Sequence, residues 1–229
     1  MSPEVSVVVP LYRTGDALPE LHRRTVAALD GRTFELVLVD DACPEGSGRA
    51  AAGLAVDDAR VQVVALPRNV GQHAAALAGL SRANGAWAVV LDGDLQDPPE
   101  AIPLLLDAGH AAGVPVVFAA RRGRYESRAR LFTSRIYKRT LALVAGVPAD
   151  AGIYMALDRS VVERVVALGG RRRPSLVAMV GCLRVPMISV PVERAARPSG
   201  RSSYRARDRM SLGLRTIAWA LAWRLRGAR

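Results

Sequence analysis

Two carboxylates two residues apart give this sequence its clearest chemical signal. Asp92 and Asp94 follow the short apolar run 87–91, which predicts a buried β-strand. Because side chains alternate along an extended chain, both carboxylates project to the same side, and Gly93 between them lets a ligand approach the backbone. Gln96 adds a neutral oxygen donor. Such oxygens suit Mg²⁺ or Mn²⁺ with positions open for substrate phosphates; the alternative is an acidic turn before a helix.

Three more apolar runs precede this strand, each followed by a helical segment. The predicted strands are 5–9, 34–39, 61–66 and 87–91. Alternation of this kind predicts an α/β fold with a mostly parallel central sheet and right-handed crossovers. Ligands of such sheets bind at the carboxyl ends of the strands, where Asp40 and Asp41 end the second run. The sequence has neither a G-x-G-x-x-G nor a P-loop string, so a dinucleotide or Walker-type site is not expected.

The second half of the chain predicts fewer strands and longer helices. Expected strands are 114–119, 151–157 and 183–190, and expected helices are 100–111, 127–145 and 158–168. Composition changes near Arg194. We therefore expect one domain over 1–193 and a basic segment over 194–229.

The basic segment carries most of the net charge of +11, with ten arginines against one acid, Asp208. Apolar residues recur in it with a helical period, at Met210, Leu214, Ile217, Leu221 and Leu225. A basic amphipathic helix can lie in a membrane interface; alternatively, the apolar stripe packs on the domain. No apolar run reaches the roughly 20 residues of a spanning helix. With two distant cysteines, these features predict a cytoplasmic protein, with peripheral contact at the inner membrane face as an option.

Several strand-end motifs together resemble a known family. They are VPLY at 9–12, VDD at 39–41, RNVG at 68–71, DGDLQDPPE at 92–100 and LDR at 157–159. This combination resembles family-2 glycosyltransferases of the GT-A fold, and within them the polyprenyl-phosphate glycosyltransferases of the dolichyl-phosphate mannose synthase group. The resemblance covers nearly the whole chain.

The resemblance implies a UDP- or GDP-sugar donor, Mg²⁺ or Mn²⁺, and inversion at the sugar carbon. It implies metal ligation by Asp92, Asp94 and Gln96. The catalytic groups that it implies are Asp94, Arg121, Arg130 and Asp150. The segment RPSGRSSY at 197–204 resembles one that closes over the donor pyrophosphate. The nucleotide-sugar contacts implied by the resemblance are Pro10, Tyr12, Asp40, Asp41, Asn69, Gly71, Asp92, Gly93, Arg197 and Ser202.

Departures from the family pattern bear on the acceptor. Thr14 stands where the family usually has an acid, and Ser203 replaces a lysine. Ile153 and Met155 replace a polar residue and an arginine, which leaves Asp150 as the nearest carboxylate. An ionised phosphate acceptor needs no general base, whereas a hydroxyl normally does. Loss of the acid is thus compatible with a lipid phosphate, whereas loss of the arginine argues for a changed acceptor.

Three functions follow from these observations. The first is a metal-dependent inverting transferase that moves a sugar to a polyprenyl phosphate at the membrane surface. The second is a soluble transferase that acts on a small-molecule hydroxyl. The third, a nucleic-acid-binding module driven by the basic segment, is the weakest, because that segment has few aromatic residues and no recognised nucleic-acid fold. No nucleic-acid partner is therefore expected.

Overall fold

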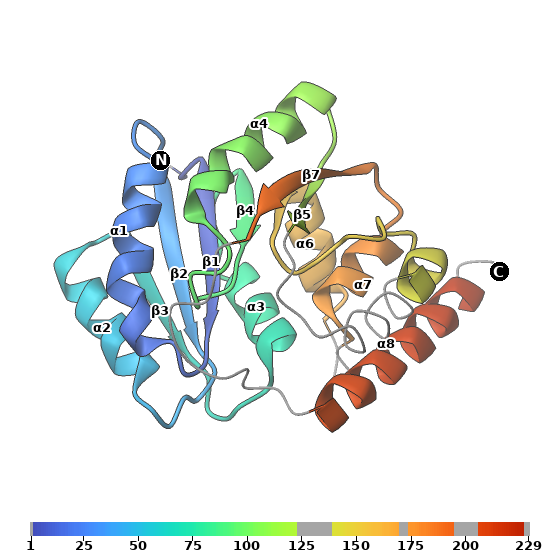
Figure 1. Cartoon of the computed structure of the whole chain (residues 1–229), viewed down its shortest axis with the longest axis horizontal. Helices are drawn as coiled ribbons and strands as arrows, with labels where there is room; N and C mark the ends of the chain where they lie inside the picture. The colour runs from blue at the N-terminus through green and yellow to red at the C-terminus, as the bar shows by residue number, and fades with distance from the viewer. Residues whose placement is uncertain (1, 123–138, 170–173, 195–205, 227–229) are drawn as a thin grey trace.

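The protein folds around one seven-stranded sheet with helices on both faces (Figure 1). The computed structural model describes residues 2–122, 139–169, 174–194 and 206–226. The strands are β1 (Val5–Leu11), β2 (Phe34–Asp40), β3 (Val61–Ala65), β4 (Trp87–Val90), β5 (Val116–Arg122), β6 (Met155–Asp158) and β7 (Met187–Glu193). The main helices are α1 (Leu18–Ala28), α2 (Ser47–Asp57), α3 (Gln72–Leu80), α4 (Ile102–Ala112), α6 (Arg159–Ala167), α7 (Leu176–Cys182) and α8 (Ala206–Arg226), and residues 139–145 are also helical.

The strand order is β3-β2-β1-β4-β6-β5-β7. β1 pairs in parallel with β2 and β4, β2 with β3, and β5 with β7. β6 runs antiparallel to both of its neighbours, β4 and β5. The predicted mostly parallel α/β sheet is therefore confirmed, with one reversed strand in its second half.

Two element predictions in the second half were misplaced. The strand expected over 151–157 is confined to Met155–Asp158, and the one expected over 183–190 begins only at Met187. Helix α7 was not predicted, because its seven residues are apolar on every side and carry no helical period.

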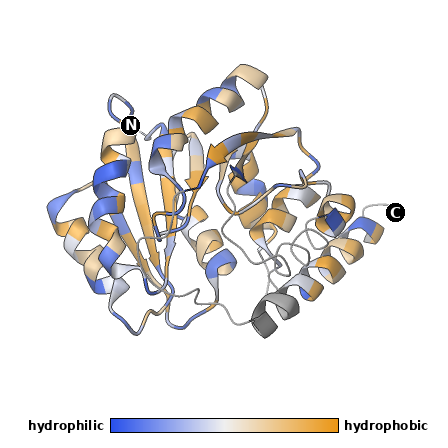
Figure 2. Ribbon diagram, in the orientation of Figure 1, coloured by the Kyte–Doolittle hydropathy of each residue, from blue (hydrophilic) through white to orange (hydrophobic). Residues whose placement is uncertain are grey.

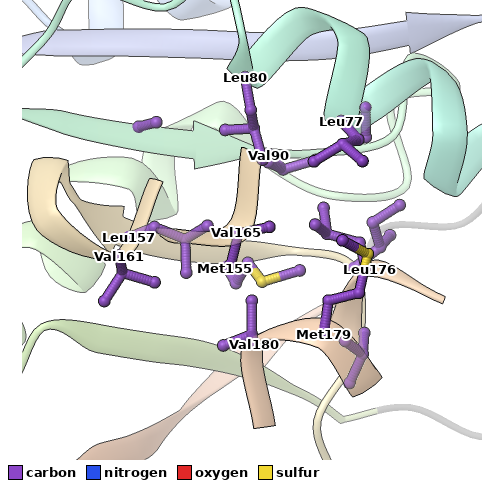
Figure 3. Packing of buried hydrophobic residues seen from close by; sticks show 14 of the residues in the cluster. Leu77, Leu80, Val90, Met155, Leu157, Val161, Val165, Leu176, Met179 and Val180 are labelled. Carbon is purple, nitrogen blue, oxygen red and sulfur yellow. The ribbon is translucent and has the colours of Figure 1, made fainter. Parts of the chain in front are cut away.

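The apolar side chains form two clusters, one on each face of the sheet. One gathers under α1, α2 and α4, and the other under α3, α6, α7 and α8. Apolar residues accordingly fill the central strands, whereas polar residues mark the outer faces of the helices (Figure 2). Met155 lies in the second cluster, where Figure 3 shows it near Val165 and Val180. The side chain that replaces the family arginine is thus fully buried in the core.

Helix α8 packs on the domain through small residues and through Trp219. Ala220 is fully buried, and the Thr216 hydroxyl accepts a hydrogen bond from the Ser175 N–H at 3.2 Å. By contrast, Leu214, Leu221 and Leu225 of the predicted stripe are 66%, 44% and 72% exposed. The face that packs on the domain is therefore not the leucine face. Within the described ranges, no helix has the length and apolar character to cross a membrane.

Candidate functional site at the carboxyl end of the sheet

The acidic turn after β4 folds back on itself. The Asp97 carboxylate, 1% exposed, accepts a hydrogen bond from the Asp92 N–H at 3.3 Å. The Asp94 carboxylate accepts one from the Gln96 N–H at 3.1 Å. Leu95 takes a left-handed backbone conformation, with φ of 61°, which turns the chain between them. The turn is therefore a closed structure that presents carboxylates at the sheet edge.

Arg121 from the end of β5 joins two of these carboxylates. Its Nη2 donates to Asp97 Oδ2 at 2.5 Å and to Asp92 Oδ2 at 3.1 Å. The turn is further held by the Tyr154 hydroxyl, which donates to the Pro98 carbonyl at 2.8 Å. On the other side of Asp92, the Gln72 amide of α3 donates to Oδ1. Side chains from β5 and α3 thus converge on Asp92, which follows β4.

This convergence shifts several pKa values. Burial, reinforced by the charge of Asp97, raises the pKa of Asp92 to about 6, although Arg121 opposes the shift. Burial also disfavours the charged form of Arg121, but Asp97 and Asp92 outweigh it and raise the pKa of Arg121. Burial, with the charge of Arg121 as a second cause, lowers the pKa of His73 to about 4. At neutral pH, His73 is therefore neutral beside a charged cluster.

The carboxyl end of β2 forms the neighbouring part of the site. Asp41 is buried, and its two oxygens accept the Val70 N–H at 2.7 Å and the Gly71 N–H at 2.9 Å. Burial raises the pKa of Asp41, whereas these two N–H groups lower it. Asp41 therefore ties the end of β2 to the loop before α3, and Asn69 in that loop is exposed.

Asp40 holds the next loop close to the sheet. Its Oδ1 accepts the Cys43 N–H at 3.0 Å. A Cβ at Gly48, in the first turn of α2, would lie only 2.3 Å from an Asp40 oxygen, so a larger residue there would displace the Asp40 side chain. The Thr14 N–H donates to the Ser47 hydroxyl at 3.1 Å, which joins the loop after β1 to the same helix.

The other predicted site residues are distributed around this edge. Pro10 is buried within β1, and Tyr12 follows that strand. Gly93 packs closely against β1, since a Cβ at this position would lie 3.2 Å from Val9 Cγ1. Asp150 is exposed and accepts a hydrogen bond from the Ser189 hydroxyl at 2.7 Å. The roles assigned to these residues stay predictions. Arg130, Arg197 and Ser202 lie outside the described residues.

Sequence reasoning missed three residues of this site. Asp97 lies in the DGDLQDPPE motif, but the motif alone does not indicate that its carboxylate holds Arg121. Gln72, at the start of α3, gave no signal because its partner Asp92 is distant in sequence. Arg194, just after β7, lies close enough to Asp92 for its charge to lower the pKa of that carboxyl. The predicted strand ended at residue 190, so no sequence signal placed Arg194 directly at the end of a strand.

The oxygen atoms of the acidic turn fit a divalent cation that takes some of its ligands from a substrate. Within the part of the chain that the structure describes, no three His, Cys, Asp or Glu side chains could hold a metal by themselves. Mg²⁺ is commonly held by one or two carboxylates plus substrate phosphates, and Asp92 and Asp94 supply two carboxylates. The ligand set Asp92, Asp94 and Gln96 stays a prediction.

The fold and this acidic edge define an α/β protein with its ligand site at the carboxyl ends of parallel strands. The chain belongs to glycosyl transferase family 2, whose model matches residues 6–166. It is 40% identical over 215 residues to the undecaprenyl-phosphate 4-deoxy-4-formamido-L-arabinose transferase of Pseudomonas aeruginosa, covering 91% of this chain and 62% of that protein. The same-named protein of Edwardsiella ictaluri is 36% identical over 204 residues, covering 87% of this chain. The chain thus spans 62% of the length of these curated relatives.

Solved structures confirm the GT-A fold. The glucosyl-3-phosphoglycerate synthase of Mycobacterium tuberculosis, solved with Mn²⁺ and UDP-glucose, has a TM-score of 0.67 at 17% identity, covering 96% of this chain and 79% of that chain. A mannosyltransferase of Pyrobaculum calidifontis, solved with GDP-mannose and Mn²⁺, has a TM-score of 0.62 at 17% identity, covering 97% and 73%.

Proposed function

We propose that this protein is a metal-dependent inverting glycosyltransferase that moves a sugar from a nucleotide diphosphate to a polyprenyl phosphate. The observation that carries the proposal is the partly buried cluster of Asp92, Asp97 and Arg121 at the carboxyl end of β4 and β5. The names of the relatives, which are undecaprenyl-phosphate transferases, support the acceptor class. The Mn²⁺ and nucleotide sugars in the related structures support the metal and the donor class.

The chemistry requires stabilisation of the departing nucleotide diphosphate. A divalent cation held by Asp92 and Asp94 would supply positive charge to the leaving group. The chain itself fixes the carboxylates before substrate arrives, because Arg121, Gln72 and the backbone of the turn hold them by hydrogen bonds. Such prior orientation means that little reorganisation is needed as the charge develops.

The experiment is a screen of UDP- and GDP-sugars with Mn²⁺, read as thermal stabilisation and as nucleotide release with farnesyl phosphate as acceptor. We expect Asp94→Ala to lower release by more than about 100-fold, because it removes a carboxylate from the charge-stabilising site. The matched control is Asp57→Ala, an exposed carboxylate at the end of α2, which should leave release unchanged.

Unchanged turnover in a folded Asp94→Ala protein would contradict the proposal. Transfer to a small-molecule hydroxyl, with none to farnesyl phosphate, would instead support the alternative acceptor class.

We also propose peripheral contact with the cytoplasmic face of the membrane through α8. Leu214, Leu221 and Leu225 face away from the packed side of the helix, and Leu143 beside it is 78% exposed. Arg224 lies against this region, since its Nη1 donates to the Leu143 carbonyl at 3.2 Å. Exposed apolar side chains near arginines match what an anionic membrane interface binds.

A further inference from the structure

Arg194 is an arginine of the candidate site for which the described residues provide no hydrogen-bond acceptor. It follows the last residue of β7, and its Nε is buried without a hydrogen-bond partner. In the described part of the chain, no side-chain hydrogen bond or ion pair joins Arg194 to another residue. Arg121, in contrast, already donates to Asp92 and Asp97. A buried guanidinium N–H without an acceptor is costly, which points to an acceptor that arrives from outside the chain.

The sheet register, continued one residue past the end of β7, places Arg194 on the same face as Arg121. In the parallel pair of β5 and β7, Arg121 lies opposite Val192. Because side chains alternate along a strand, Arg194 shares the face of Val192 and therefore of Arg121. Its charge also reaches Asp92, where it favours the ionised carboxylate. The two guanidiniums thus approach the acidic turn from the same side. The Nε of each lacks a hydrogen-bond partner, but Nη2 of Arg121 is held by Asp92 and Asp97, whereas Arg194 donates to no side chain among the described residues.

The strand order indicates which anion that is. Asp40 ends β2 in the half of the sheet where the donor nucleoside is proposed to bind, and Asp92 follows β4 in the middle. β7 is the edge strand at the opposite end of the order from β3. Arg194 therefore lies across the acidic turn from the nucleotide half, on the side left for the acceptor.

We propose that Arg194 binds the phosphate group of the acceptor, an inference that rests on the proposed function. In that reaction an acceptor phosphate oxygen forms a bond to the sugar carbon. The bond from this carbon to the donor diphosphate breaks, and its electron pair leaves with the nucleotide diphosphate. The acceptor phosphate is already ionised, so Arg194 positions it by charge-assisted hydrogen bonds and no proton is transferred.

Calorimetry with farnesyl phosphate, on protein loaded with Mn²⁺ and UDP or GDP, tests this inference. We expect Arg194→Gln to weaken farnesyl phosphate binding by about 10- to 100-fold, because it removes hydrogen bonds from a charged donor to a phosphate. Arg194→Lys should restore part of the loss. Binding of farnesol, which lacks the phosphate, and binding of the nucleotide should change less than about twofold.

The matched control is Arg184→Gln. Arg184 is an exposed arginine near the other end of β7, so its loss removes the same charge away from the site. Farnesyl phosphate affinity that is unchanged in Arg194→Gln overturns the inference, and so does an equal loss of nucleotide affinity. Failure of the proposed function looks different, because the wild-type protein would then not bind a nucleotide diphosphate with Mn²⁺ at all.

Discussion

Replacing Asp97 with asparagine tests whether the buried carboxylate and Arg121 hold the acidic turn. Asp97 is 1% exposed and Arg121 is 24% exposed, at a separation of 2.5 Å. A hydrogen bond to a charged group contributes about 1.5–3 kcal/mol. Loss of the sole partner of a buried charge costs about 3–5 kcal/mol, but Arg121 keeps Asp92 at 3.1 Å. We therefore expect Asp97→Asn to lower the free energy of unfolding by about 2 kcal/mol.

The measurement is urea unfolding at pH 7, combined in a double-mutant cycle with Arg121→Gln. We expect a coupling free energy above about 1 kcal/mol, because the two side chains touch. Glu20→Gln is the control, since its pair with Arg23 is exposed at 45% and 68% and should contribute less than about 1 kcal/mol. A loss below about 0.5 kcal/mol in Asp97→Asn, or the absence of coupling, would refute the reasoning.

Two further predictions concern pH and membranes. The pKa of His73 is lowered to about 4 in the folded protein from an ordinary value near 6.5, so the unfolded chain binds the extra proton. The contribution of His73 to stability therefore falls as pH drops from 7 to 5, and the raised pKa of Asp92 acts in the opposite direction. This loss is at most about 2 kcal/mol, and His73→Gln should remove it. The measurement is urea unfolding of both proteins at pH 7 and at pH 5. An equal change of the unfolding free energy with pH in the two proteins would contradict this prediction. Replacing Leu221 and Leu225 with serine should weaken sedimentation with phosphatidylglycerol vesicles at least about tenfold without destabilising the fold, since both are exposed. The control is Val56→Ser, 85% exposed on α2, and equal losses in both variants would argue against α8 as the contact.

The first half of the sheet could be predicted because its signals are local. Every residue of β1, Val5–Leu11, is buried, and a continuous valine-rich run is what a parallel strand covered on both faces requires. The reversal of β6 could not be predicted in the same way. Its direction depends on pairing with β4 and β5, which lie far away in sequence, and a strand of four residues carries no sign of its direction.

In the candidate site, too, only the features that follow from local sequence signals could be predicted. Parallel strands bring their carboxyl ends together, so the proximity of Asp41 and Asp92 to one edge followed from the strand pattern. That both oxygens of Asp41 would bind backbone N–H groups did not follow, because the loop conformation at Val70 and Gly71 decides it. Similarly, Asp97 lies in a proline-containing turn that resembles a solvated one, and only the arrival of Arg121 from β5 explains its burial.

The position of β6 also bears on how the chain folds during synthesis. β4 ends at Val90, but its partner β6 is complete only at Asp158, about 70 residues later. At ribosomal speeds of about 5–20 residues per second, the outer edge of β4 stays unpaired for roughly 3–14 s. An apolar strand edge exposed for so long can pair with another chain, so aggregation of nascent protein is the hazard that this topology carries. Slower translation between these two strands would lengthen the time for which the edge of β4 is unpaired, without changing the native state.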